Sequence, residues 1–302
     1  MIDGFVEQRL EELRHEYLAY KKKASLFSKA SVVLLLLAIV MAVVFQSVLN
    51  PVITIVIGAV VAVLADSPSK SYNKKAAECE AEFKTLYKSE FGRAILYESL
   101  EDVEYIEKQG FSEDMVNRFD VVSWGNRFSS EDYLKAKYNG ITFEQSDVTI
   151  KHKSKESPAR TTFKGRIMKF SYPKTVKDVR ICSRKTVVIN LGSGSEYSSK
   201  HVVTEDVDFN NKLDVWSKDE QEGFYLLTPR FMEVLKRLAE KYSYVCFHFK
   251  ENDLYLALET ERDSFDCPMD TAIQYEVEKA RIEADIEETK SIIDALYMEN
   301  YN

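Results

Sequence analysis

One uncharged stretch, from Ala30 to Ala65, constrains the fold of this chain more than any other part of its sequence. Its first part, Ala30–Leu49, holds twenty residues without a formal charge, and its second part, Pro51–Ala65, holds fifteen more. A spanning helix needs about 20 apolar residues to cross a hydrocarbon layer roughly 30 Å thick. The first part meets this requirement, whereas the second covers only about 22 Å at about 1.5 Å per residue.

Asn50 and Pro51 separate the two parts and form a start signal for a second helix, with an N-cap side chain followed by proline at the first helical position. A single helix through this stretch would carry Pro51 in its interior and would exceed the thickness of a bilayer. We therefore predict a transmembrane helical hairpin over residues 30–66. A re-entrant hairpin that stays in one leaflet is the alternative, because the second part is short. A signal peptide is disfavoured, because a polar segment of nearly thirty residues precedes the apolar stretch.

Basic residues flank the apolar stretch on both sides and predict its orientation. The connecting loop, Gln46–Asn50, carries none of them. We therefore expect both termini to face the cytoplasm. The flanking residues are Arg9, Arg14, Lys21, Lys22, Lys23 and Lys29 before the stretch and Lys70, Lys74 and Lys75 after it.

Apolar residues spaced alternately three and four apart predict amphipathic helices on either side of the hairpin, at residues 1–29 and in a helical connector at 67–108. The two stripes could pack on each other, pack separately on the rest of the chain, or join copies of the chain into a homo-oligomer. A break at Asp66-Ser67-Pro68 would bend the second arm. The stripes are Val6, Leu10, Leu13, Tyr17 and Tyr20, then Tyr72, Ala76, Cys79, Phe83 and Leu86.

The order of helix and strand patterns in residues 109–302 predicts a cytoplasmic α+β domain. This domain is expected to be mainly antiparallel sheet, with an inserted helix and a long helix at its end. Asn139-Gly140 is typical of a two-residue hairpin turn between strands at Asp132–Tyr138 and Ile141–His152. Alternating patterns predict two further strands at Thr161–Tyr172 and Val179–Leu191.

The C-terminal part of this domain adds a helix, a strand pair and a final long helix. Thr228-Pro229 begins the inserted helix, and strands at Val245–Phe249 and Leu254–Leu258 follow it. A turn at Glu251-Asn252-Asp253 is expected to let these two strands pair antiparallel. A long charged helix is predicted from about Thr271 to Met298.

Motifs of known catalytic chemistry are missing from the sequence, which has no H-E-x-x-H, no phosphate-binding loop ending in Gly-Lys-Ser/Thr and no nucleophile elbow. The histidines His15, His152, His201 and His248 are isolated, and His248 is interpreted as structural, on the less buried face of its strand. The four cysteines show no C-x-x-C spacing, and we expect them to stay thiols in a reducing cytoplasm. We predict no catalytic residue, no metal site and no cofactor.

The basic sector, Lys151–Lys185, is the strongest candidate site. It carries twelve Lys or Arg against Glu156 and Asp178, a net +10 in a chain whose net charge is −8. The anionic leaflet of a bilayer is its expected ligand, with neutralisation by acidic surfaces of the fold as the alternative. Few aromatic residues interleave with these charges, which argues against nucleic acid. The candidate lipid- or anion-binding residues are Lys151, Lys153, Lys164, Arg166, Lys169, Arg180, Arg184 and Lys185.

Four segments in order resemble the bacterial domain-of-unknown-function family 3137: Asp132–Val148, Thr161–Arg166, Asp208–Leu238 and Phe249–Glu259. The most specific parts are Phe163-Lys164-Gly165 and the string from Phe209-Asn210 to Leu227-Thr228-Pro229. Leu213 departs from the phenylalanine that many members carry there. The resemblance implies a bacterial protein anchored in the inner membrane, often encoded near coiled-coil membrane proteins of the LemA type. It implies no activity and no catalytic residue.

Together these features predict a membrane-anchored cytoplasmic scaffold or interaction module, oriented on anionic lipid by the basic sector. Its expected partners are the lipid bilayer and either another protein or a second copy of the chain, bound through the amphipathic helices. The alternative is an enzyme that acts on a lipid or on another membrane-associated substrate.

Overall fold

The computed structural model describes residues 4–44, 51–154, 158–184, 200–262, 265–270 and 272–297. The chain divides into two compact units. The first, here called the helical unit, comprises Met1–Phe91 with Cys267–Glu278, and the second, the sheet unit, comprises Gly92–Asp266 with Lys279–Asn302. The division at residue 91 falls inside the helical connector expected at 67–108.

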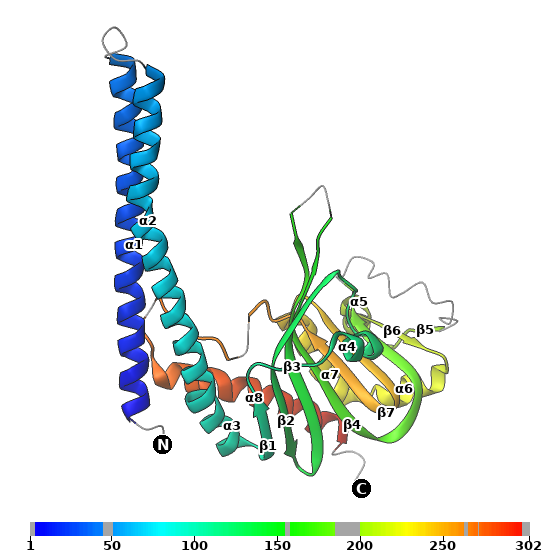
Figure 1. Cartoon of the computed structure of the whole chain (residues 1–302). Helices are drawn as coiled ribbons and strands as arrows, with labels where there is room; N and C mark the ends of the chain where they lie inside the picture. Colours follow the sequence, from blue (N-terminus) through cyan, green and yellow to red (C-terminus); the bar gives the residue numbers. More distant parts are fainter. Residues whose placement is uncertain are drawn as a thin grey trace. The chain divides into compact units, whose positions relative to one another are not determined.

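The helical unit is built from α1 (Gly4–Val44), α2 (Pro51–Leu86) and a π-helical turn, η1 (Tyr87–Gly92). The helices α1 and α2 lie side by side and antiparallel (Figure 1). Arg9 contacts Glu82 at 2.6 Å near one end, and a Cβ at Gly58 would meet Ala38 toward the other. Apolar side chains of both stripes are buried, namely Leu10, Leu13, Ala76, Cys79 and Phe83. The helix α2 continues through Pro68, where the sequence had suggested a break.

The helix α1 is long and apolar enough to cross a membrane, with a mean hydropathy of 2.2 over its most apolar window. Many apolar side chains of that window point outward, since Val33 is 54% exposed and Leu36 is 56% exposed. The expected loop at Gln46–Asn50 lies outside the described residues.

The sheet unit holds a seven-stranded antiparallel sheet in the order β1-β2-β3-β4-β6-β5, with β7 paired to β4. This confirms the predicted mixed fold with an antiparallel sheet. The strands are β1 (Glu101–Ile106), β2 (Arg127–Tyr138), β3 (Ile141–His152), β4 (Arg160–Ser183), β5 (Lys200–Val202), β6 (Leu213–Ser217) and β7 (Val245–Leu258). The helices are α3 (Arg93–Ser99), α4 (Glu113–Phe119), α5 (Val207–Lys212), α6 (Glu220–Leu226), α7 (Pro229–Lys241) and α8 (Tyr275–Tyr297), the last belonging to this unit from Lys279 onward.

The turn between β2 and β3 has the predicted residues and geometry. Asn139 and Gly140 both adopt positive φ, at 49° and 76°, as a two-residue hairpin turn requires. Tyr138 and Ile141 then pair directly across it.

The central strand β4 is one continuous strand where the sequence predicted two. On one edge it pairs with β7 along most of its length, and on the other it pairs first with β3 and then with β6. The register shifts between Ser171 and Val179, and Glu251 of β7 adopts a positive φ of 56° opposite this point.

The sequence had predicted that the two arms of β7 pair with each other, and this prediction is wrong. Both pair with β4, and the ribbon of β4 and β7 bends back on itself. The backbone N–H of Glu259 donates to the Tyr244 carbonyl oxygen at 2.9 Å, which brings the two ends of β7 together.

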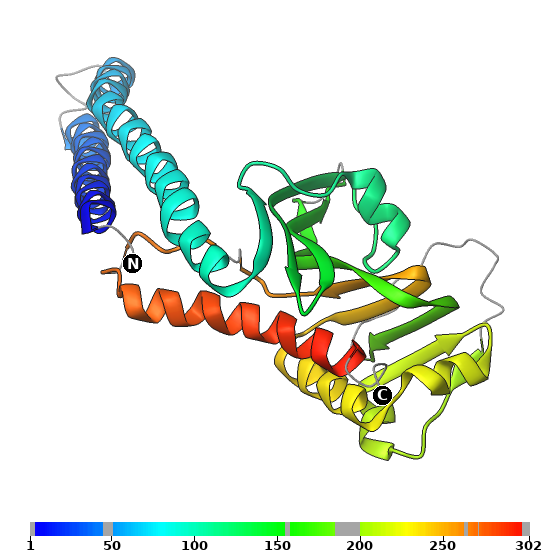
Figure 2. The ribbon, with the colours of Figure 1, turned by 90° about the horizontal axis from the view of Figure 1, so that it is seen from below.

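Helices cover the two faces of this bent sheet. On one face, Phe111, Val116 and Phe119 of the α4 region pack in a core with Ile150 and Phe163. On the other face α7 and α8 run side by side (Figure 2), and Tyr242 donates to Glu288 of α8 at 2.5 Å. Phe231 of α7 meets the rings of Phe247 and Phe249 edge-on. The predicted long C-terminal helix is confirmed as α8.

Candidate interaction surfaces

Two arginines of the basic sector lie inside the fold rather than on a surface. Arg166 is 3% exposed and its guanidinium reaches Asp285 of α8 at 3.0 Å. Arg180 is 1% exposed and pairs with Asp120 at the end of α4. Burial alone would lower the pKa of Arg166, but the carboxylates of Asp285 and Asp147 more than offset it and the pKa is raised. These arginines connect the sheet to its covering helices and cannot reach a lipid headgroup.

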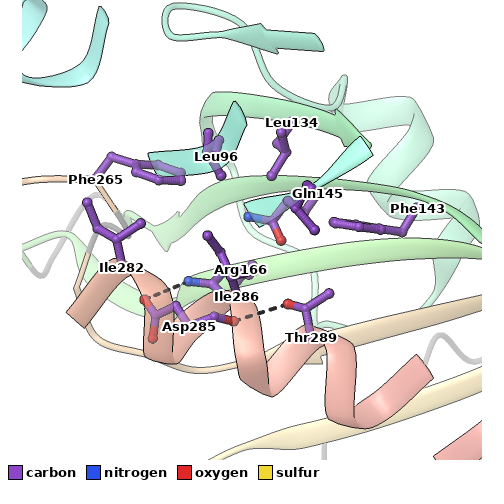
Figure 3. Close-up of a pocket in the computed structure, with 11 residues that line it drawn as sticks. Leu96, Leu134, Phe143, Gln145, Arg166, Phe265, Ile282, Asp285, Ile286 and Thr289 are labelled. Carbon is purple, nitrogen blue, oxygen red and sulfur yellow. Dashed lines mark hydrogen bonds and ion pairs between the residues drawn. The ribbon is translucent and has the colours of Figure 1, made fainter. Parts of the chain in front are cut away.

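The Arg166–Asp285 pair lines a small, mostly apolar pocket between the sheet and α8 (Figure 3). Thr289 donates to the Asp285 carbonyl oxygen at 3.2 Å, and Arg262 approaches the Asp285 carboxylate at 3.4 Å. The pocket encloses about 10 Å³, room for one water at most. It is a satisfied ion pair in a packed interface and not a ligand site.

Other basic residues of the sector are neutralised in part by neighbouring carboxylates. Lys169 is half-buried and lies 3.4 Å from Asp253, and exposed Arg184 lies 3.5 Å from Asp214. Lys164 is half-buried, and Lys185 lies outside the described residues. The alternative of neutralisation by the fold therefore applies to a large part of the sector.

A group of exposed basic residues lies at one end of the β3–β4 ribbon. Lys151 and Lys153 are exposed there, next to Arg160 on β4 and to Arg127, which pairs with Lys151 from β2. Trp124, 59% exposed, lies on the adjoining segment, and two hydrogen bonds tie that segment to the backbone of Lys153 through Asn126. We call these five residues the basic ribbon end: Trp124, Arg127, Lys151, Lys153 and Arg160. The sequence did not indicate Trp124 and Arg127, because both lie outside Lys151–Lys185. They come close to Lys151 only through the pairing of β2 with β3.

A second surface feature, absent from the sequence predictions, is an apolar groove beside α6 and α7. It has a volume of about 490 Å³. Its apolar lining comes from Phe224 and Leu227 of the α6 end and from Pro229 and Met232 of the α7 start. Phe224 remains 47% exposed and its neighbour Tyr225 63% exposed. A contiguous exposed apolar surface of this kind commonly marks a binding site.

Local sequence signals shape the groove. The Thr228 hydroxyl accepts a hydrogen bond from the Phe231 N–H at 3.2 Å and Pro229 occupies the first turn, so α7 begins at the predicted point. Asp206 caps α5 in the same way, accepting from the Phe209 N–H at 2.9 Å. Because Phe231 points into the core, Met232 lies on the groove side of α7.

The rim of the groove is acidic. Glu205, Asp206 and Glu233 line it, and Lys236 contacts two of them, at 3.0 Å from Asp206 and 2.6 Å from Glu233. The Phe209 N–H, together with Lys236, lowers the pKa of Asp206, which keeps the carboxylate charged. Three carboxylates against one ammonium leave the rim with a net negative charge.

Among the residues that the structure describes, no group of three or more His, Cys, Asp or Glu could hold a metal ion. His248 is 2% exposed, so its predicted place on a less buried face is wrong. Its Nδ1 lies 2.8 Å from the Phe119 carbonyl oxygen and its Nε2 3.0 Å from Asp178. The ring thus joins β7 to α4 and to β4, a structural role.

Two cysteines are joined by a disulfide in the structure, whereas the sequence predicted thiols for all four in a reducing cytoplasm. Cys182 of β4 and Cys246 of β7 stand opposite each other in the register and are bonded. Sequence spacing could not reveal this pair, because 64 positions separate the two residues. Cys79 and Cys267 are buried thiols.

Comparison with known proteins supports the family resemblance and adds little on function. Residues 161–298 match the family described as "Protein of unknown function (DUF3137)", which confirms the predicted resemblance over the range from β4 to α8. No curated protein matches the chain. A solved structure, the crystal structure of the mycobacterial trehalose monomycolate transport factor A, TtfA, is similar at a TM-score of 0.34 and 8% identity, covering 64% of this chain and 88% of that chain. A likeness at this level carries no functional argument.

Proposed function

We propose that this protein is a membrane-anchored interaction module whose sheet unit binds a segment of a partner protein in the groove beside α6 and α7. The observation that carries the proposal is the groove itself, with an apolar floor that includes the half-exposed ring of Phe224. Apolar side chains that stay exposed next to one another gain the most free energy when a partner covers them.

The chemistry of the groove indicates the chemistry of its occupant. Phe224, Leu227 and Met232 suit apolar side chains, and the carboxylates of Glu205 and Glu233 suit a cation at the edge. The partner segment is therefore a short stretch with two or more apolar residues and at least one Lys or Arg, held as an amphipathic helix or an extended strand.

The membrane anchor in this proposal is the apolar part of α1, paired with that of α2 as a spanning hairpin. The exposed apolar side chains of α1 and its hydropathy support it. Its proposed sidedness rests on the flanking lysines: with these on the inner side, both termini would lie in the cytoplasm at the bacterial inner membrane. The basic ribbon end would then orient the sheet unit on anionic lipid, with Trp124 suited to the membrane–water interface.

The test introduces a photocrosslinking amino acid at Met232 of the full chain in native membranes, followed by mass spectrometry of the captured peptide. We expect a captured segment with apolar residues next to Lys or Arg. Glu205→Gln with Glu233→Gln should lower capture several-fold, because a rim charge steers a cationic partner. The matched control, Glu101→Gln with Glu113→Gln, removes two exposed carboxylates from β1 and α4, which do not line the groove, and should leave capture unchanged. The proposal would be overturned if the groove variant captured as much peptide as the control variant, or if the captured segments were acidic.

A further inference from the structure

A cluster of aromatic rings joins α1 to α2 next to the apolar part of the two helices. Tyr72 of α2 stacks on two rings of α1, Tyr20 at a centroid distance of 6.2 Å and Phe27 at 5.8 Å. The rings are inclined by only 24° and 17°. The apolar stretch begins three residues beyond Phe27, at Ala30, so the stacked rings lie at its border.

Lysines from both helices lie over these rings. The Lys23 Nζ is 5.6 Å from the centroid of Tyr72, and the Lys75 Nζ is 6.0 Å from the same centroid and 5.8 Å from that of Tyr20. Ring faces attract ammonium groups through the quadrupole and do not neutralise them. Both lysines are exposed, so each ammonium keeps donors for a further acceptor.

Charge around the rings is strongly one-sided. Residues 17–29 and 66–75 hold seven lysines and one carboxylate, Asp66, a net charge of +6. Asp66 lies 3.8 Å from Lys70, and the closest carboxylate to Lys74 is Glu78 at 4.0 Å, a turn farther along α2. The lysines are Lys21, Lys22, Lys23, Lys29, Lys70, Lys74 and Lys75.

We propose that Lys23 and Lys75, held over the ring of Tyr72, bind the phosphate of an anionic lipid headgroup. This inference rests on the proposed membrane anchor, which would bring the rings to the height of the headgroups. In this proposal the two ammonium groups, each within about 6 Å of the Tyr72 centroid, donate to the same phosphate from two packed helices. The positive surroundings disfavour the trimethylammonium of a zwitterionic headgroup and favour a net anionic one.

The test uses the full chain reconstituted into vesicles of phosphatidylcholine with phosphatidylglycerol, floated on a density gradient and then extracted in mild detergent. Mass spectrometry of the retained lipid gives the enrichment of phosphatidylglycerol over phosphatidylcholine. Lys23→Gln with Lys75→Gln should lower this enrichment about fivefold or more. Tyr72→Leu, which keeps every charge, should lower it by a smaller factor.

The matched control is Lys22→Gln with Lys74→Gln, because it removes the same two charges from the same two helices at exposed positions away from the ring. It should lower the enrichment less than about twofold. If both double variants lowered the enrichment equally, the effect would come from net charge alone, and the proposal would be overturned. If neither variant lowered the enrichment, the proposal would also be overturned. A chain that does not float with the vesicles would overturn the anchor and the site together, whereas a chain that floats without lipid preference would overturn the site alone.

Discussion

The helical unit and the sheet unit place their apolar side chains in opposite ways. In the helical unit, Leu36 and Val40 of α1 are more than half exposed. The stripe formed by the start of α1 and the end of α2 is buried instead, and it packs as in a coiled coil. In the sheet unit, Phe247 and Phe249 are fully buried between β7 and α7. This difference indicates that part of the helical unit is suited to contact with lipid chains, whereas the sheet unit buries its apolar side chains in a core of its own. The groove beside α6 and α7 is an exception, because Phe224 stays exposed there.

The two units also differ in how they hold cations. At the border of its apolar part the helical unit keeps Lys23 and Lys75 exposed over ring faces. The sheet unit instead buries Arg166 and Arg180 against carboxylates. A planar guanidinium loses less on burial than an ammonium does and can donate to several acceptors at once. The buried arginines therefore stabilise the sheet unit, whereas Lys23 and Lys75, like Lys151 and Lys153 of the sheet unit, remain exposed to solvent.

The largest expected effect comes from breaking the buried ion pair of the sheet unit. Asp285→Ala leaves the guanidinium of Arg166 buried without its main carboxylate, and should lower the free energy of unfolding by about 3–5 kcal/mol. Both tryptophans of the chain, Trp124 and Trp216, belong to the sheet unit, so tryptophan fluorescence during urea unfolding follows that unit. Lys137→Ala removes an exposed pair with Asp102 and should cost about 1 kcal/mol or less. Equal losses in the two variants would contradict the contrast between buried and exposed pairs.

A charge on the outward face of α1 should have the opposite consequence. Leu36→Arg should leave urea unfolding of the sheet unit unchanged and disfavour membrane insertion by about 2.5–3.5 kcal/mol. Glycosylation-based insertion assays of α1 measure the second quantity. Unchanged insertion would show that the outward apolar face does not meet hydrocarbon.

The Cys182–Cys246 disulfide allows a test of the side of the membrane on which the sheet unit lies. Reduction of the purified protein should lower the free energy of unfolding by about 2–4 kcal/mol, because the bond cross-links distant parts of the chain. In growing cells a cytoplasmic sheet unit should keep Cys182 and Cys246 reduced. Alkylation after rapid acid quenching reads this state. A mostly oxidised pair in cells would place the sheet unit outside the cytoplasm and contradict the proposed orientation.

A smaller effect than those of Asp285, Leu36 and the disulfide is expected at Asp178. Partial burial would raise its pKa, but hydrogen bonds from His248 and Lys218 more than offset burial, and the pKa is lowered. A folded pKa below the unfolded value stabilises the fold above the unfolded pKa of about 3.9, and this stabilisation is lost as pH falls through the folded pKa. Asp178→Asn should cost about 1–3 kcal/mol at neutral pH and flatten the acid limb of stability against pH. An acid limb of unchanged slope would show that Asp178 does not contribute.

Local signals in the sequence predicted the local parts of the fold. Asn139-Gly140 specifies a hairpin turn through its own backbone preferences, and Thr228-Pro229 begins α7 through its own cap. The continuity of β4 could not be predicted in this way, because β7 completes its ladder from far along the chain. The bend lies where the register of β4 and β7 shifts, between Ser171 and Val179.

The candidate site shows the same limit more sharply. Charge pattern grouped Arg166 and Arg180 with surface lysines, but their carboxylate partners lie 119 and 60 positions away in the chain. The groove did carry one signal, since Phe224 and Tyr225 are adjacent aromatic residues in a short helix and cannot both point to one core. That signal predicts an exposed ring but does not reveal that Met232 and Glu205 border it.

The central claim is that the exposed apolar surfaces of the two units meet different partners, lipid at α1 and a protein segment at the groove. Photocrosslinking of the full chain in native membranes tests this claim directly, with the reactive side chain placed at Leu36 in one variant and at Met232 in the other. The account predicts lipid adducts from Leu36 and peptide adducts from Met232. Lipid adducts from Met232, or peptide adducts alone from Leu36, would contradict it.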